Sequence, residues 1–212
     1  MSNTNPYQPV IELENRIAEW AGCKHCITTD SCSSSIFLAI QYRKHEGYEI
    51  GEVTIPKHTY VSVPCSIIHS GGRVKFSDEK WEGLYELQPL RIWDSALRFR
   101  KGMFSQIIQT LNGLQCISFH IKKRLSVGRG GAILTNDDRA NEWLRRARFD
   151  GRSPVPLLED DFTQLGWNCY LTPEQGARAL QLFELLRNKE NPDLKVEEQS
   201  YPDLSLFKVY QQ

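Results

Sequence analysis

Apolar positions along this chain recur with two different spacings, and the two spacings alternate. Val10, Leu13, Ile17 and Trp20 have the spacing of a buried helical stripe, which Gly22 ends. Short apolar runs typical of buried strands occupy residues 26–29, 52–56, 73–76, 90–93, 115–119 and 131–135. Further helices are predicted over residues 36–43, 61–69, 138–149 and 173–188. Strands that alternate with helices predict an α/β domain with a largely parallel sheet.

Two stretches interrupt this alternation. Residues 77–89 are short and irregular, with little room for a helix between two strands. The chain from Lys189 onward is charged and ends in an apolar run, residues 204–210, for which we expect an edge strand. We therefore divide the chain into one domain over residues 1–188, abbreviated between residues 77 and 93, and a C-terminal tail over residues 189–212.

Composition and charge exclude several classes of function. The 212 residues are 40% hydrophobic and carry 26 basic and 26 acidic side chains, so their net charge gives no reason to expect a nucleic-acid or membrane partner. The polar N-terminus lacks the apolar core of a signal peptide, and no apolar run approaches the length of a membrane span. Cys23 and Cys26 resemble half of a zinc site without a second pair of ligands, so no metal is expected. These features predict a soluble, cytoplasmic protein.

Serine is concentrated where the first predicted strand gives way to a helix. In open α/β sheets, ligands bind at the carboxyl ends of the strands. Residues 31–35 lie at such an end and include Ser31, Ser33, Ser34 and Ser35. A helix N-terminus that combines free backbone N–H groups with hydroxyls suits a phosphate. Simple helix capping needs only one of these hydroxyls, and the pattern leaves both readings open.

A second strand end carries two adjacent lysines. Lys122 and Lys123 lie on the connection between the strands at residues 115–119 and 131–135, with Arg124 and Arg129 close by in the sequence. A lysine that is desolvated or crowded by other cations can lose its proton and attack an aldehyde to form a Schiff base. The alternative is an ordinary surface turn with solvated lysines.

Asp94 and Tyr60 also follow predicted strands. A carboxylate at the end of a buried strand needs a partner, which could be Arg98, Arg100 or a cationic heterocycle. An aromatic ring at Tyr60 could cover a ligand ring or could simply pack against the protein. A phosphate cradle, a lysine for an aldehyde, a carboxylate for a pyridinium nitrogen and a stacking ring together suit pyridoxal 5′-phosphate (PLP).

The same segments resemble, in order, the motifs of the DegT/DnrJ-type (StrS-like) sugar aminotransferases. The family's Ser-Gly-Thr-x-Ala-Leu phosphate loop is similar to residues 31–36, and its Pro-x-x-Thr-(aromatic) segment to residues 56–60. Its Glu-Asp-Ala-Ala-Gln motif is similar to residues 93–97, its Ser-Phe-His-x-x-Lys motif to residues 118–123, and its Gly-x-Asn-x-Arg-(Leu/Met) motif to residues 166–171. The resemblance extends roughly from residue 11 to residue 188. It implies the three-layer, mostly parallel sheet of the fold type I PLP-dependent transferase large domain, with the C-terminal small domain largely missing.

The resemblance also implies a role for each matching residue. Its register selects Lys123, not Lys122, as the Schiff-base lysine and proton shuttle, with Asp94 on the ring nitrogen and Tyr60 over the ring. In the family, the asparagine that matches Asn168 reaches the cofactor of the neighbouring subunit, which implies a homodimer with shared active sites. The implied cofactor-binding residues are Ser31, Cys32, Ser33, Tyr60, Asp94, Ser118, Lys123 and Asn168, of which Lys123 and Asp94 are catalytic.

By the same resemblance, the reaction moves an amino group from glutamate or glutamine to a keto group on a nucleotide-linked sugar. Arg98, Arg124 and Arg129 are candidates to meet the substrate diphosphate. Another possibility within the family is a PLP-dependent sugar dehydratase. The family's dehydratases carry histidine in place of the lysine, so Lys123 weighs against this reading.

Several departures from the family pattern favour an alternative function. Family members are usually much longer, and residues 77–89 lack a strand–helix unit that normally precedes the aspartate strand. Cys32 replaces the loop glycine, Leu97 replaces a polar residue beside the ring, and Tyr170 replaces an arginine. The alternative is a reduced, non-catalytic relative that binds PLP or a sugar nucleotide, or that acts through dimerisation.

Overall fold

The computed structural model describes residues 5–108 and 112–211. Its α-helices are α1 (Gln8–Ala21), α2 (Cys32–His45), α3 (Ser62–His69), α4 (Asp138–Ala147) and α5 (Pro173–Leu186). Its strands are β1 (His25–Thr29), β2 (Glu52–Pro56), β3 (Arg73–Ser77), β4 (Tyr85–Leu87), β5 (Ile92–Asp94), β6 (Leu114–Ser118) and β7 (Gly131–Thr135). Short 3₁₀ helices follow at η1 (Leu157–Glu159), η2 (Glu197–Gln199), η3 (Leu204–Leu206) and η4 (Lys208–Tyr210).

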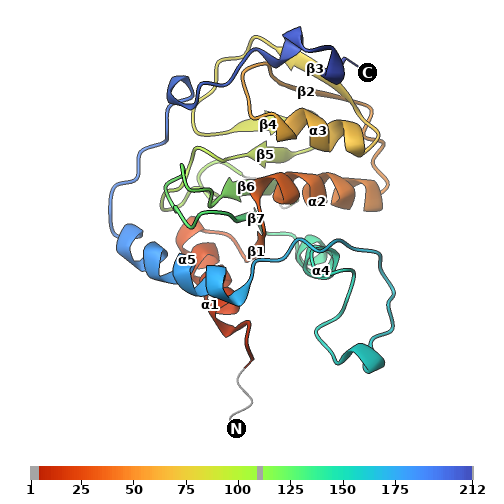
Figure 1. Ribbon diagram of the computed structural model, residues 1–212, viewed down its shortest axis with the longest axis vertical. Helices are drawn as coiled ribbons and strands as arrows, with labels where there is room; N and C mark the ends of the chain where they lie inside the picture. Colours follow the sequence, from red (N-terminus) through yellow and green to blue (C-terminus); the bar gives the residue numbers. More distant parts are fainter. Residues whose placement is uncertain (1–4, 109–111, 212) are drawn as a thin grey trace.

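The strands form a five-stranded sheet in the order β1-β7-β6-β5-β4 and a two-stranded sheet of β2 and β3. Thr54 of β2 and Gln88, which follows β4, exchange backbone hydrogen bonds of 2.9 and 3.2 Å. This bridge joins the two sheets, so β4 lies between β5 and β2. The strands therefore form one continuous layer across the middle of the molecule (Figure 1).

The predicted α/β class is confirmed, but the strand directions are more mixed than the sequence predicted. The pairs β5–β6 and β2–β3 are parallel, whereas β1–β7, β6–β7 and β4–β5 are antiparallel. The physical reason lies in the connections. Residues 119–130 return from β6 to β7 without a helix that crosses the sheet, and residues 88–91 join β4 to β5 by a short turn. Such connections leave neighbouring strands antiparallel.

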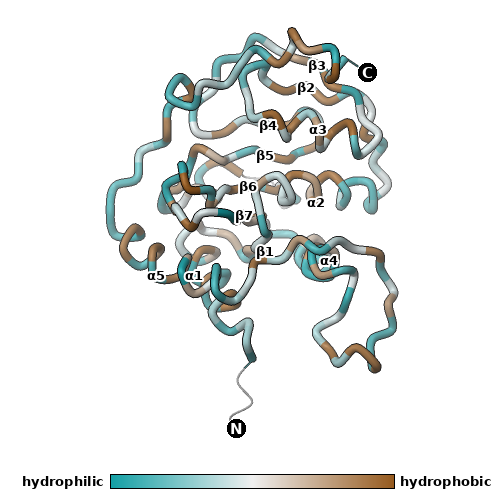
Figure 2. The backbone as a smooth tube through the Cα atoms, viewed as in Figure 1, coloured by the Kyte–Doolittle hydropathy of each residue, from teal (hydrophilic) through white to brown (hydrophobic). Residues whose placement is uncertain are grey.

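Helices cover both faces of the sheet and give the expected three layers. One core cluster joins α2, α3 and α4 to the sheet residues Ile27, Cys116 and Ile133. The other joins α1 and α5 to Cys26, Ile117 and Leu134. Neighbouring residues of each strand thus pack on opposite faces, as the pleat of a strand requires. Figure 2 shows the apolar residues concentrated along the strands and on the helices beside them.

Most predicted elements are present within a few residues, and two predictions are corrected. The irregular stretch at residues 77–89 contains β4, which is three residues long and pairs with β5. The edge strand predicted over residues 204–210 is wrong, because these residues form η3 and η4. Within this segment Leu204 is buried and the Tyr210 ring lies 6.3 Å from that of Phe76 on β3, whereas Leu206 and Phe207 are exposed.

A buried ion cluster ties α1, β1 and α4 together. Glu14 is 1% exposed and accepts hydrogen bonds from the Thr28 backbone N–H at 2.9 Å and the Thr28 hydroxyl at 2.8 Å. Arg145 lies 2.6 Å from Glu14, and Arg148 also pairs with it. Burial alone raises the pKa of Glu14, but the two arginines and the Thr28 N–H outweigh it and lower that pKa.

None of the helices within residues 5–108 and 112–211 combines the length and the apolar character needed to cross a bilayer.

Candidate active site

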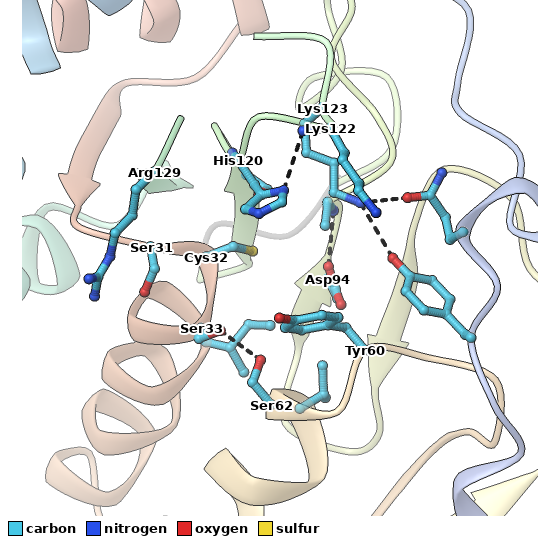
Figure 3. Close-up of a pocket in the computed structure, with 17 residues that line it drawn as sticks. Ser31, Cys32, Ser33, Tyr60, Ser62, Asp94, His120, Lys122, Lys123 and Arg129 are labelled. Atoms are coloured by element: carbon cyan, nitrogen blue, oxygen red, sulfur yellow. Dashed lines mark hydrogen bonds between the residues drawn. The ribbon is translucent and has the colours of Figure 1, made fainter. Parts of the chain in front are cut away.

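A cavity of about 400 Å³ opens where β1, β2, β5 and β6 end. The last residues of β5 and β6 line the cavity, and the chain reaches it within four residues of the ends of β1 and β2, as expected for an open α/β sheet. All of the predicted cofactor-binding residues except Asn168 line it, namely Ser31, Cys32, Ser33, Tyr60, Asp94, Ser118 and Lys123. Figure 3 shows these side chains converging from α2, from the segment before α3, from β5 and from the connection after β6.

The serine-rich loop forms the N-terminus of α2. Ser31 is the N-cap, and its hydroxyl accepts the backbone N–H of Ser34 at 3.1 Å. The Ser33 hydroxyl donates to that of Ser62 at 2.6 Å. Gly131 lets β7 approach this loop closely, because a Cβ at residue 131 would lie 2.6 Å from the backbone nitrogen of Cys32. Ser31 thus caps the helix, and Ser33 lines the cavity in the first turn of α2, where the helix dipole favours an anion.

Asp94 is 3% exposed at the end of β5. Its Oδ1 accepts the Ala96 N–H at 2.9 Å, and its Oδ2 accepts the hydroxyl of Tyr85 at 3.0 Å. Burial raises the pKa of Asp94, and these two donors and the charge of Lys123 oppose that rise only in part. Neither arginine suggested as its partner pairs with it: Arg98 lies 2.6 Å from Asp193 instead, and Arg100 lies 4.0 Å from the same carboxylate.

Lys123 is the half-buried lysine of the pair, and its neighbour Lys122 is exposed. The Lys123 Nζ donates to Gln199 Oε1 at 3.0 Å and to the Tyr201 hydroxyl at 3.4 Å, as the dashed lines in Figure 3 show. Burial lowers the pKa of Lys123, and the charge of Lys122 lowers it further, while Asp94 and Cys32 act in the opposite direction. This arrangement can supply a neutral amine more readily than a solvated lysine can.

Tyr60, Ser118 and Arg129 also line the cavity. Tyr60 is 53% exposed, and its ring lies beside Asp94 in Figure 3. The Ser118 hydroxyl accepts the backbone N–H of His120 at 3.3 Å. Arg129 lines the cavity and pairs with Asp30 at 2.7 Å.

Three residues predicted for the site lie outside the cavity: Asn168, Arg124 and Arg98, which pairs with Asp193 instead. Asn168 is exposed and outside the cavity, where its amide donates to Asp150 at 3.0 Å. The Arg124 guanidinium is turned toward the tail and donates to the carbonyl of Pro192 at 2.9 Å.

Sequence reasoning missed Tyr85, Ser62, Gln199 and Tyr201. Tyr85 comes from the stretch that was read as irregular, and Gln199 and Tyr201 come from the tail that was read as separate from the site. The separation along the chain between Lys123 and its tail partners is 76 and 78 residues. No local pattern reports a contact over that distance, so only the fold reveals these partners.

The sequence profile of the DegT/DnrJ/EryC1/StrS aminotransferase family matches residues 2–94 and 92–188. The chain belongs to this family. The resemblance that the motifs predicted is thereby confirmed. The two matched segments meet in β5, directly after the stretch that was predicted to be abbreviated.

Known relatives share the sequence and the fold over part of their length. The chain is 24% identical over 200 residues to the spore coat polysaccharide biosynthesis protein SpsC of Bacillus subtilis (strain 168), covering 76% of this chain and 48% of SpsC. It superposes on AtS13 from Actinomadura melliaura with a TM-score of 0.67 and 18% identity, covering 83% of this chain and 59% of AtS13. For PseC of Helicobacter pylori, an aminotransferase involved in the biosynthesis of pseudoaminic acid, the TM-score is 0.65 at 18% identity, covering 84% of this chain and 57% of PseC. The chain thus spans about half the length of the curated relative it matches.

Proposed function

We propose that this chain is a PLP-dependent aminotransferase that moves an amino group from glutamate or glutamine to a keto group on a nucleotide-linked sugar. The observation that carries the proposal is the meeting of Asp94 and Lys123 in one cavity with the N-terminus of α2. A buried carboxylate and a half-buried amine at separate strand ends are costly for stability unless a ligand uses them. Family membership supports the reaction class.

The residues fit PLP chemically. The Asp94 carboxylate, whose pKa is raised by burial, gains a cationic partner if a protonated ring nitrogen enters the cavity. The N–H groups that begin α2, with the hydroxyls of Ser33 and Ser118, suit the phosphate. Lys123 is the amine that would hold the aldehyde carbon, and Tyr60 is the aromatic side chain available to cover the ring.

Bound PLP supplies an electron sink that stabilises negative charge on the substrate's Cα. Asp94 would pair with a protonated ring nitrogen and so keep the positive charge on which that electron withdrawal depends. Lys123 has a lowered pKa, so a larger share of its amine is neutral near pH 7 than in a solvated lysine, and it can accept a proton and return it at a neighbouring carbon. The half-buried position of Lys123 also limits the access of water to this proton transfer.

We further propose that two copies of the chain share their active sites. Asn168, the residue expected to reach a neighbouring cofactor, is exposed and lies outside its own cavity. The nearby loop between α4 and α5 exposes a group of apolar side chains, with Leu158 at 100%, Leu165 at 88% and Phe162 at 57%. This apolar stretch is visible at the tip of the loop in Figure 2. Sedimentation of the wild type and of Leu158→Asp would test whether this loop lies at a dimer interface.

Titration with PLP tests the cofactor assignment. The purified protein would be mixed with PLP, its absorbance scanned, and the complex reduced with borohydride and mapped by mass spectrometry. We expect the pyridoxyl group on Lys123 in the wild type and in Lys122→Ala, and no label at this turn in Lys123→Ala. Labelling of Lys122 in the wild type, or no cofactor-dependent absorbance at all, contradicts the assignment.

The alternative is a non-catalytic relative that binds PLP or a sugar nucleotide, or that acts through dimerisation, and the departures from the family motifs at Cys32, Leu97 and Tyr170 favour it. Adding glutamate to the PLP-loaded protein separates the two functions. Conversion of the bound cofactor to pyridoxamine 5′-phosphate, with formation of 2-oxoglutarate, supports the aminotransferase. Stable binding without conversion by glutamate or glutamine supports the non-catalytic relative.

A further inference from the structure

The C-terminal segment, residues 189–204, returns from α5 to the mouth of the cavity. In Figure 1 it runs up one side of the molecule from the end of α5 toward β3. Several contacts anchor it along this path. Arg98 pairs with Asp193 at 2.6 Å, the Leu194 N–H donates to the carbonyl of Leu97 at 2.8 Å, and the Leu204 N–H donates to that of Lys57 at 3.0 Å.

Between these anchors the segment supplies both side-chain partners of Lys123. Gln199 Oε1 accepts from the Lys123 Nζ at 3.0 Å, the Tyr201 hydroxyl accepts at 3.4 Å, and both residues line the cavity. The Nζ also lies 6.0 Å from the centroid of the Tyr201 ring, within the range of a cation–π contact.

Trp81 holds the Tyr201 ring in this place. The two rings are 12° from parallel, with centroids 6.4 Å apart. The Trp81 indole is itself fixed, because its Nε1 donates to the carbonyl of His58 at 3.0 Å and its ring packs edge-to-face on Tyr85 with centroids 4.7 Å apart. Tyr85 is the residue that donates to Asp94. The rings of Tyr201, Trp81 and Tyr85 therefore form a continuous row of contacts. One end of this row bonds to Lys123 and the other to Asp94.

Gln199 favours one protonation state of the lysine, whereas the Tyr201 hydroxyl can form a hydrogen bond with either state. The Gln199 carbonyl can only accept, so it favours the charged ammonium. Burial raises the pKa of Tyr201, and the charge of Asp94 raises it further, so its hydroxyl stays protonated and can accept from the ammonium or donate to the neutral amine. Other groups whose charge acts on Lys123 are Asp94, Cys32 and Lys122.

We propose that Gln199 and Tyr201 are positioning residues for Lys123, and that the C-terminal segment which carries them forms one wall of the active site. The role in cofactor chemistry rests on the proposed function, whereas the contact with Lys123 does not. The two residues hold the amine in the cavity before it reacts and hold it again whenever it is released.

The test measures the pKa of Lys123 in the protein without cofactor. The rate at which acetic anhydride modifies each lysine is followed against pH by mass spectrometry of chymotryptic peptides, since only the neutral amine reacts. Loss of the Gln199 carbonyl in Gln199→Ala should lower the pKa of Lys123 by about one unit, which raises its acetylation rate about tenfold at a fixed pH below that pKa. Gln199→Glu places a carboxylate beside the amine and should raise the pKa by about one unit.

Tyr201→Phe keeps the ring on Trp81 and removes the hydroxyl. Because the hydroxyl serves both protonation states, we expect a smaller change in pKa than for Gln199→Ala, together with a severalfold loss of PLP affinity. Tyr210→Phe, farther along the chain and outside the cavity, should leave both quantities unchanged. Circular dichroism confirms that each variant is folded before it is compared.

The outcomes separate this proposal from the proposed function. Opposite shifts of the Lys123 pKa in Gln199→Ala and Gln199→Glu support the contact even if the protein never binds PLP. If both variants titrate like the wild type while PLP still labels Lys123, the assignment of Gln199 and Tyr201 is overturned and the cofactor assignment stands.

Discussion

Replacing Tyr85 by phenylalanine would remove a hydroxyl from the environment of Asp94 and leave the ring in place. The Tyr85 hydroxyl donates to Asp94 Oδ2 at 3.0 Å and lies 2.6 Å from the Thr59 hydroxyl. Tyr85 is 3% exposed and its ring packs against Trp81, so phenylalanine fills the same space. The substitution therefore tests the hydrogen bond to the carboxylate more than the packing.

The size of the effect follows from the charge and the burial of the carboxylate. A hydrogen bond to a charged group contributes about 1.5–3 kcal/mol, so Tyr85→Phe should destabilise the protein by about that amount at neutral pH. Dividing by 1.36 kcal/mol per unit, the pKa of Asp94 should rise by about one to two units. That pKa is already raised by burial, and the substitution moves it further in the same direction.

The pH dependence gives the sign of the effect. A carboxyl group whose pKa is raised by folding binds more protons in the folded state than in the unfolded state, so its ionisation destabilises the fold as the pH rises from the unfolded pKa toward the folded one. The extra destabilisation in Tyr85→Phe should thus be largest above the folded pKa of Asp94. It should shrink as the pH falls toward the unfolded value of about 3.9.

Urea unfolding at several pH values, with a ¹³C NMR titration of Asp94, measures both quantities. Tyr42→Phe is the matched control, because Tyr42 is 2% exposed and donates at 3.2 Å to Asp137, which is only half-buried. Because water can reach the half-buried Asp137 and replace the lost donor, the cost should be smaller, about 0.5–1.5 kcal/mol. If Tyr85→Phe costs no more than this control and leaves the pKa of Asp94 unchanged, the assigned role of Tyr85 is refuted.

Three further substitutions test the frame around the site. Glu14→Gln leaves Arg145 and Arg148 without their carboxylate and should cost about 3 kcal/mol in urea unfolding, at the low end of the range for broken buried pairs because Arg145 is partly exposed. Since the pKa of Glu14 is lowered by folding, its contribution is present above the unfolded pKa and is lost as the pH falls through the folded pKa, so wild type and Glu14→Gln should converge in acid. Thr172→Ala removes the capping box of α5 and should lower stability by about 1 kcal/mol in the same assay. Gly131→Ala forces a Cβ against the loop that begins α2. The loop must shift to accommodate it, so we expect a loss of PLP affinity in a titration of the folded variant.

The local elements could be predicted from the sequence because their signals are local. Thr172 and Pro173 mark the start of α5, and the structure shows Thr172 in a complete capping box. The strand at residues 131–135 has the predicted bounds and is buried on both faces, as its run of small and apolar residues indicates. The strand at residues 52–56 also has the predicted bounds, although Glu52 is exposed and Thr54 is half-buried. Strand direction carries no such signal, so the three antiparallel pairs were not foreseen.

Within the site, the sequence located the groups that can react and missed the groups that hold them. Asp94, Lys123 and the serine loop lie at strand ends within matching motifs, which fixed their positions along the chain. β4 is three residues long and exists because Tyr85–Leu87 pair with β5, which is a tertiary interaction. The tail was read as an appendage because its charged residues have no helical or strand period.

Two stretches in which the sequence offered no functional motif meet at the candidate active site. Tyr85 comes from the abbreviated stretch and orients Asp94, whereas Tyr201 comes from the tail and contacts Lys123. Trp81, also from the abbreviated stretch, packs on both tyrosine rings. A motif can be matched residue by residue, but the pKa of a buried group depends on every charge and dipole around it. The protonation of Asp94 and of Lys123 in this chain therefore depends partly on contacts that these two stretches supply, which motif matching alone does not report.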